Sequence, residues 1–312
     1  MRVLQNLLIT IMCFGLGACE EKSPTFDAER AFEYLVKQCD FGPRNPGSVG
    51  YESCKQFLIS EAEKVADKVQ LQPFSYTEKK ENRRYDLVNI IARFNPESKT
   101  QIMIGAHWDT RPWAEQDQNK DKRALPIIGA NDGASGVAVL LELMQFLAKN
   151  PPSVGVNIIF LDGEDLGIRG ESESFGQGAA YFAKNLPIPK PKEAIIVDMV
   201  GDTQLTLPIE RNSFRQNRSL VKKLWNRAHE LNLDAFQSKI AYEIYDDHVP
   251  LFKYAGIPAI DIIDFHYPNR YTNFWHTHSD LPQNCSAKSL GQVGTLLVDY
   301  IFYYASETES GS

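Results

Sequence analysis

The fold is decided by residues 101–109, which read QIMIGAHWD. A run of mostly apolar residues ends there in a histidine and an aspartate, and similar runs end in acids at 156–165 (VNIIFLDGED) and 194–198 (AIIVD). Short apolar runs of this kind predict buried strands. Because polar groups at the carboxyl ends of parallel strands meet at one edge of a sheet, we expect these acidic and imidazole side chains to converge there.

The remaining pattern predicts an α/β fold. Helices are expected at 26–39, 50–68, 134–149, 216–232 and 287–304, and strands at 69–76, 86–94, 101–106, 156–161, 193–199 and 257–263. This alternation is typical of a three-layer helix–sheet–helix sandwich with a central, mostly parallel twisted sheet. The polar stretches 111–126, 167–177 and 264–274 are expected to be loops over the site. Since no internal repeat and no change of composition follows residue 25, residues 26–312 are predicted to form a single catalytic domain.

Composition excludes one large class of partners. The chain has 312 residues, 43% of them hydrophobic, and a formal net charge of −7. It carries no block or stripe of lysine and arginine, so nucleic-acid binding is not expected. The acidity is partly concentrated in the candidate site, which suits a metal ion or a substrate that carries a positive amine.

The first 19 residues are typical of a targeting segment. Arg2 supplies a positive charge, residues 7–14 (LLITIMCF) form an apolar run that is short for a membrane span, and residues 16–19 (LGAC) resemble a bacterial lipobox. We therefore expect Cys19 to be lipidated and residues 20–25 to be a polar tether. The protein would then be held on a membrane of the bacterial cell envelope, facing the periplasm or the exterior. The alternative is a plain secretory signal with a chance cysteine.

Three further cysteines, Cys39, Cys54 and Cys285, would lie in an oxidising compartment. A disulfide between Cys39 and Cys54 is one option, but spacing alone does not establish it. None of the three cysteines belongs to a zinc-binding cysteine pattern.

Asp132 lies in the sequence GANDGASG at 129–136, directly before the apolar segment 134–149. Small neighbours allow a close approach of the backbone and leave this carboxylate at the start of a helix, where it could bind a metal. The alternative is an N-cap, a position that aspartate favours in its own right.

Glu164 and Asp165 form an adjacent pair of carboxylates after a buried strand. Such a pair needs a cation or a proton, so one acid can bind a metal while the other transfers protons. The alternative is a solvated acidic loop. Asp198 follows four apolar residues and is expected to be partly buried, where it could also cap a helix or pair with an arginine.

The histidines leave several assignments open. His276 lies between Trp275, which can supply a dry wall, and Thr277-His278, so His278 is a competing ligand. His107 either binds a second metal or only forms hydrogen bonds within the site, and Asp109 shares this ambiguity. No Gly-x-Ser-x-Gly elbow and no phosphate-binding loop ending in Gly-Lys-Ser/Thr is present.

Taken together, these motifs resemble the zinc aminopeptidase-like superfamily, and within it the bacterial glutaminyl-peptide cyclotransferases (glutaminyl cyclases). The resemblance covers about residues 26–305 and rests on HWDTRPW at 107–113, GANDGASG at 129–136, DGED at 162–165, Asp198, DDHVP at 246–250 and FWHT at 274–277. It implies an open, mostly parallel twisted sheet flanked by helices.

The resemblance also implies roles for particular residues. Asp132, Asp165 and His276 match the three ligands of one zinc ion, Glu164 matches the catalytic acid/base, and Asp198 and Asp246 match carboxylates of a supporting hydrogen-bond network. Trp113, Phe274 and Trp275 are expected to form aromatic walls around the substrate. The chain departs from the animal cyclases in having Asp165 where they have glutamate and Asp261 where they have a further histidine.

The implied reaction is zinc-dependent cyclisation of the N-terminal glutamine of peptides or proteins to pyroglutamate, with release of ammonia. The alternative is a two-zinc aminopeptidase, because His107 and Asp198 match that enzyme's second-metal ligands, and a hydroxide bridging two metals is its nucleophile. A lipid-anchored binding domain without chemistry is a third class, which the retained Glu164 and the full ligand set argue against.

Overall fold

The computed structural model of the protein describes residues 25–78 and 82–305. The expected signal peptide and Cys19 lie outside the described residues. Within those two ranges, no helix is both long and apolar enough to span a membrane. The larger helices are α1 (Ala28–Asp40), α2 (Val49–Val65), α3 (Ala134–Lys149), α4 (Gln177–Lys184), α5 (Arg211–Gln216), α6 (Arg218–Glu230), α7 (His248–Ala255) and α8 (Ala287–Asp299), which continues as a π-helical turn (Tyr300–Ala305).

A central sheet has the strand order β1-β2-β4-β3-β5-β8. Its strands are β1 (Lys68–Glu78), β2 (Arg83–Phe94), β3 (Gln101–His107), β4 (Gly155–Leu161), β5 (Ala194–Asp198) and β8 (Ala259–Ile263). β1 and β2 pair antiparallel, β2 joins β4 antiparallel, and β4, β3, β5 and β8 run parallel. The prediction of a mostly parallel sheet is confirmed.

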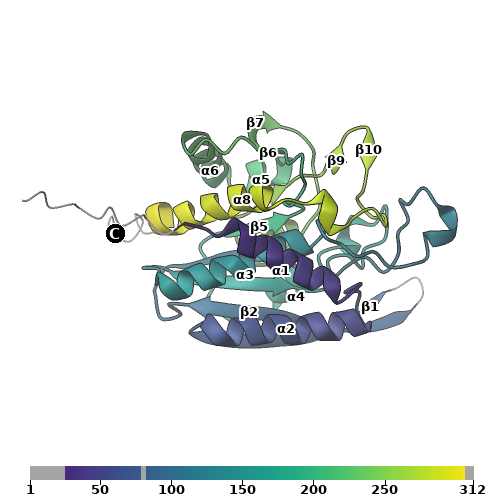
Figure 1. Cartoon of the computed structure of the whole chain (residues 1–312). Helices are drawn as coiled ribbons and strands as arrows, with labels where there is room; N and C mark the ends of the chain where they lie inside the picture. Colours follow the sequence, from purple (N-terminus) through teal and green to yellow (C-terminus); the bar gives the residue numbers. More distant parts are fainter. Residues whose placement is uncertain (1–24, 79–81, 306–312) are drawn as a thin grey trace, which may run out of the picture.

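Side chains alternate between the two faces of this sheet. Ile158, Phe160, Ile195 and Val197 belong to a large core shared with α1, α2, α3 and α8, whereas Ile159, Leu161 and Ile196 belong to a second core shared with α4 and α7. Successive strand residues point to opposite faces, so apolar runs without alternation are required when both faces are covered. Figure 1 shows helices over the sheet, with α1 beside α3 and α2 along the edge formed by β1 and β2. The three-layer sandwich is confirmed.

Polar caps set where most of the long helices begin. The side chains of Asp27, Ser48, Asn217 and Ser286 accept hydrogen bonds from backbone N–H groups in the first turns of α1, α2, α6 and α8. Such caps satisfy amide groups that have no partner within the helix. All five predicted helices and all six predicted strands are present within a few residues of their expected bounds.

Sequence reasoning missed the short elements. These are the helices α4, α5 and α7, the two-stranded sheet of β6 (Leu207–Ile209) and β7 (Phe236–Ile240), and the small hairpin of β9 (Pro268–Asn269) and β10 (Thr272–Asn273). Elements of two to eight residues carry too little periodicity to be recognised. The structure has Cys39, Cys54 and Cys285 as buried free thiols, so the disulfide considered for Cys39 and Cys54 is not formed.

Candidate metal and catalytic site

The carboxyl edge of the parallel strands gathers the side chains that carry chemistry. His107 ends β3, Asp132 precedes α3, Asp165 follows β4, Asp198 ends β5, Asp246 precedes α7 and His276 lies in the loop after β10. All of them are buried. This is the convergence expected from parallel strands that end at one edge.

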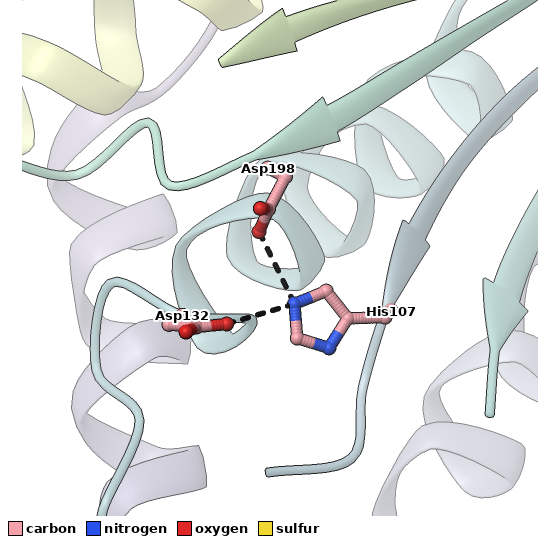
Figure 2. Close-up of side chains that lie close together, drawn as sticks. All are labelled: His107, Asp132 and Asp198. Atoms are coloured by element: carbon pink, nitrogen blue, oxygen red, sulfur yellow. Dashed lines mark hydrogen bonds and ion pairs between the residues drawn. The ribbon is translucent and has the colours of Figure 1, made fainter. Parts of the chain in front are cut away.

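His107 joins two of the carboxylates. Its Nε2 atom lies 3.1 Å from Asp132 Oδ1 and 3.1 Å from Asp198 Oδ1, and the contact with Asp198 is a hydrogen bond (Figure 2). The ring fits because residue 133 is glycine, where a Cβ would lie 2.6 Å from His107 Cε1. Burial lowers the pKa of His107, but its contacts with the carboxylates of Asp109, Asp132 and Asp198 outweigh burial and hold that pKa well above its usual value.

Asp132, Asp165 and His276 form a group that suits a metal ion. One ligand atom from each lies within 4.8 Å of the other two. His276 Nε2 is 3.1 Å from Asp165 Oδ1 and 3.6 Å from Asp132 Oδ2. Both Asp165 carboxylate oxygens and Asp132 Oδ2 are buried without a hydrogen bond. Burying carboxylate oxygens without a partner costs free energy, which a bound cation would offset. Two carboxylates and one imidazole are ligands that zinc accepts, so the three residues fit a zinc ion.

Asp132 does not cap helix α3. The N-cap residue is Gly133, and no side chain caps this helix. The loop is held instead by Asp280, whose carboxylate accepts hydrogen bonds from Asn131 N (2.7 Å) and Asp132 N (3.1 Å). The N-cap alternative for Asp132 is therefore wrong, and its side chain is free to face His276.

Glu164 and Asp165 are held by Asp109, whose carboxylate accepts hydrogen bonds from both backbone amides, at 3.1 and 3.2 Å. Glu164 is 9% exposed and Asp165 is 1% exposed, so the alternative of a solvated loop is wrong. Burial raises the pKa of Glu164 well above its usual value, and the charge of Asp246 adds to this effect. Burial also acts on Asp165, but the charge and contact of His276 together with the charges of Arg111 and His107 outweigh it and lower that pKa. One acid of the pair is thus suited to bind a cation, and the other to carry a proton.

Asp198 is buried and partnered, as expected. Its partner is His107, and it neither caps a helix nor pairs with an arginine. Burial raises the pKa of Asp198 to about 6, although His107 opposes the shift.

The two histidines of residues 276–278 have different partners. His276 Nδ1 lies 2.8 Å from Glu115 Oε1, which leaves Nε2 facing the carboxylates. His278 Nδ1 lies 2.9 Å from Asp117 Oδ2. Among the residues that the structure describes, His278 belongs to none of the groups that could hold a metal.

A buried polar cluster lies behind Asp246. His248 Nε2 is 3.2 Å from Glu210 Oε2, and His248 Nδ1 is 3.8 Å from Asp261 Oδ2. Glu210, Asp247, His248 and Asp261 are fully buried. Sequence reasoning assigned no role to Glu210, Asp247 or His248, and the only signal was two adjacent acids and an imidazole at 246–248.

A cavity of about 200 Å³ opens over the site. Its polar lining includes Asp132, Glu164, Asp246 and His276, and its aromatic lining is Phe175, Tyr245, Phe265 and Trp275. Of the three aromatic residues expected to form its walls, the structure brings only Trp275 there. Trp113 lines a separate cavity of about 380 Å³ with Arg111, and Phe274 packs edge-on against Tyr267.

Comparison with known proteins supports this arrangement. Residues 89–301 match peptidase family M28. The glutaminyl-peptide cyclotransferase of Boiga dendrophila is 24% identical over 249 residues, which cover 69% of this chain. The match spans 65% of that relative's length, slightly less than two thirds.

Solved structures from one bacterium carry two different functional descriptions. A glutaminyl cyclase of Bacteroides thetaiotaomicron, solved with bound N-acetylhistamine, is 33% identical, with 90% of this chain and 99% of that chain covered and a TM-score of 0.85. A leucine aminopeptidase precursor of the same organism is also 33% identical, with 90% and 98% covered and the same TM-score. The fold is therefore shared by proteins described as cyclases and as peptidases.

Proposed function

The chain belongs to peptidase family M28, and from that premise we propose that it cyclises the N-terminal glutamine of peptides and proteins to pyroglutamate, with release of ammonia. One observation carries the proposal. The carboxyl of Glu164, with its raised pKa, lines the same small cavity as the metal-ligand candidates Asp132 and His276. A proton carrier beside a metal, in a cavity with aromatic walls, is what an intramolecular acyl transfer needs.

Asp132, Asp165 and His276 would hold one zinc ion per chain, because three protein ligands and an open position are typical of catalytic zinc sites. When bound there, zinc would polarise the γ-carbonyl of the glutamine and stabilise negative charge on its oxygen. His107, between Asp132 and Asp198, would fix the orientation of both carboxylates.

Glu164 is the proposed proton carrier. In cyclisation the α-amine of the substrate attacks its own side-chain amide, a C–N bond forms, and the bond to the departing nitrogen breaks. Glu164 would accept the proton that the amine loses and return it to the leaving ammonia. Attacking and attacked groups belong to one residue, so the enzyme mainly orients them and shields them from water.

Asp246 and Asp198 are proposed to support this step without contacting the substrate's reacting bond. Burial raises the pKa of Glu164, and the negative charge of Asp246 raises it further. A raised pKa favours the uptake of a proton by Glu164. Asp198 holds His107 by a hydrogen bond of 3.1 Å. Trp275 lines the cavity and is the proposed wall beside the substrate.

A two-zinc aminopeptidase is the second candidate, and one observation favours it. His107, Asp132 and Asp198 also form a buried group that could hold a metal. His107 Nε2 lies 3.1 Å from carboxylate oxygens of Asp132 and Asp198, just as His276 Nε2 lies 3.1 Å from Asp165, so zinc content and not this geometry separates the two candidates.

A mass-spectrometric assay tests the proposal. A peptide that begins with glutamine should lose the mass of one ammonia when incubated with the zinc-loaded enzyme. Loss of the mass of a complete amino-acid residue would show hydrolysis and support the peptidase instead.

The proposed location is the bacterial cell envelope, where a lipid on Cys19 would hold the domain on a membrane through residues 20–25. The support is the sequence LGAC at 16–19, which follows the apolar run of residues 7–14. The proposed substrates are then peptides and proteins that reach this compartment.

A further inference from the structure

Glu115 links two polar groups that converge on His276. It lies in the loop 111–126, where its carboxylate accepts a hydrogen bond from Arg111 Nη2 at 2.7 Å and from Arg111 Nε at 3.1 Å. The same carboxylate lies 2.8 Å from His276 Nδ1. The side chains of Arg111 and His276 are 1% and 2% exposed, whereas that of Glu115 is 24% exposed.

This contact determines which nitrogen of His276 is available. A carboxylate paired with an arginine offers only acceptor atoms, so His276 Nδ1 carries the proton and donates it to Glu115. In the neutral form of the ring, which is the form that binds a metal, the lone pair is then on Nε2, the atom that faces Asp132 Oδ2 and Asp165 Oδ1. Zinc binds the nitrogen that carries the lone pair, so the tautomer set by Glu115 is the one that can bind.

The loop also holds the backbone of His276. Gln116 N donates a hydrogen bond to His276 O at 3.2 Å. His276 has a φ of 55°, in the left-handed region that residues other than glycine seldom adopt. Such a conformation persists only where neighbouring groups hold it, and here contacts to the side chain and to the backbone both come from residues 115 and 116.

Arg111 connects this support to a second ligand. Its Nη1 atom donates to the backbone oxygens of Asp165 (2.9 Å) and Gly167 (2.7 Å). One guanidinium therefore orients Glu115, behind His276, and also fixes the loop that carries Asp165.

We propose that Glu115 is a positioning residue that orients His276 for zinc through a carboxylate–histidine pair supported by Arg111. The proposal rests on the zinc site of the proposed function but not on the reaction carried out there. It therefore holds equally for a cyclase and for a peptidase.

The chain contains a matched control for the test. Asp117, two residues further along the same loop, accepts a hydrogen bond from His278 N and lies 2.9 Å from His278 Nδ1. Glu115→Ala and Asp117→Ala thus each remove one carboxylate–histidine pair of this loop, but only the first touches a ligand candidate.

Zinc affinity is measured by competition with a chelator on the full chain, without any substrate. Glu115→Ala should weaken zinc binding by about 10–100-fold, the usual effect of losing such a partner. Glu115→Gln keeps a hydrogen-bond acceptor but loses the charge, so its zinc affinity should lie between that of the wild type and that of Glu115→Ala. Asp117→Ala should bind zinc like wild type.

Two results would overturn the proposal. The first is wild-type zinc affinity in Glu115→Ala, or in Glu115→Gln if the alanine variant does not fold. The second is an equal loss of zinc affinity in Asp117→Ala and Glu115→Ala, which would show that the effect comes from a general loosening of the loop. If the zinc affinities follow the expected order but the wild-type enzyme does not cyclise glutamine, the proposed function is refuted and the role of Glu115 is still supported.

Discussion

His107 Nε2 and Asp198 Oδ1 lie 3.1 Å apart and form a hydrogen bond between the ends of the neighbouring strands β3 and β5. Asp132 Oδ1 is at the same distance from the same nitrogen. In the one-zinc reading Asp198 holds His107 and does not bind metal, whereas in the two-zinc reading the same oxygen is a ligand. The role of Asp198 therefore separates the two candidate functions.

The first prediction concerns zinc content. Asp132→Ala and His276→Ala should lose the metal, because a site with three protein ligands does not tolerate the loss of one, while Asp198→Asn should keep about one zinc per chain. Elemental analysis of the purified proteins measures this. Two tightly bound zinc ions in the wild type, one of them lost in Asp198→Asn, would favour the peptidase.

The second prediction concerns Glu164. Glu164→Gln removes the proton carrier but keeps the shape of the side chain, so turnover should fall by about 10²–10⁴-fold while zinc content stays unchanged. Steady-state kinetics and metal analysis test both halves. Glu171→Gln, an exposed acid nearby, is the control and should keep wild-type turnover. Loss of zinc in Glu164→Gln would instead make this residue a ligand.

The third prediction distinguishes two tryptophans. Trp275→Ala should lower turnover of a glutamine-initiated peptide by about tenfold, which corresponds to the loss of about 1.4 kcal/mol of contact with an aromatic wall. Trp113→Ala should have a much smaller effect because Trp113 lines the separate cavity beside Arg111. Steady-state kinetics of the two variants on the same peptide test this prediction. A larger loss of turnover in Trp113→Ala than in Trp275→Ala would show that Trp113 contacts the substrate.

The fourth prediction concerns acid stability. Burial raises the pKa of Glu210, but the hydrogen bond and charge of His248 and the amides of Ser213 and Asn212 outweigh it and lower the pKa to about 2. A carboxyl whose pKa is lower in the folded state stabilises the fold above its unfolded-state value of 4.5, and loses that contribution as pH falls toward 2.

Glu210→Gln should therefore be less stable than wild type near neutral pH, by on the order of 1–3 kcal/mol. The difference should shrink as pH falls from 4.5 toward 2, the range set by the two pKa values of this carboxyl. Denaturant unfolding at a series of pH values measures it, with the exposed Glu97→Gln as control. A difference that stays constant over this range would contradict the role of the charge.

The fifth prediction concerns the anchor. Wild-type protein should partition with membranes, whereas Cys19→Ser should be released as soluble protein because it lacks the acylated cysteine. Fractionation and mass spectrometry of the mature N-terminus test this. A soluble wild-type protein whose N-terminus lies elsewhere would refute the lipobox.

Much of the fold was available from the sequence because strand and helix patterns are local. The mostly apolar runs of β3, β4 and β5 predicted buried strands, and the structure adds that two hydrophobic cores cover them on opposite sides of the sheet. The same runs placed His107, Asp165 and Asp198 at strand ends, where parallel pairing brings them together. Short elements such as α5 and β6 were missed because they span less than two turns of helix or a few strand residues.

Local patterns in the chain were thus enough to predict the layers, the sheet and the edge at which acids and imidazoles gather. Which of these groups face one another depends on contacts between distant segments. His276 faces the carboxylates and His278 does not, because Glu115 and Asp117, each 161 residues away along the chain, hold them in different directions. Trp275 reaches the cavity while Trp113 stacks beside Arg111. Contacts between distant loops depend on how packed elements bring them together, and no local pattern of residues encodes that.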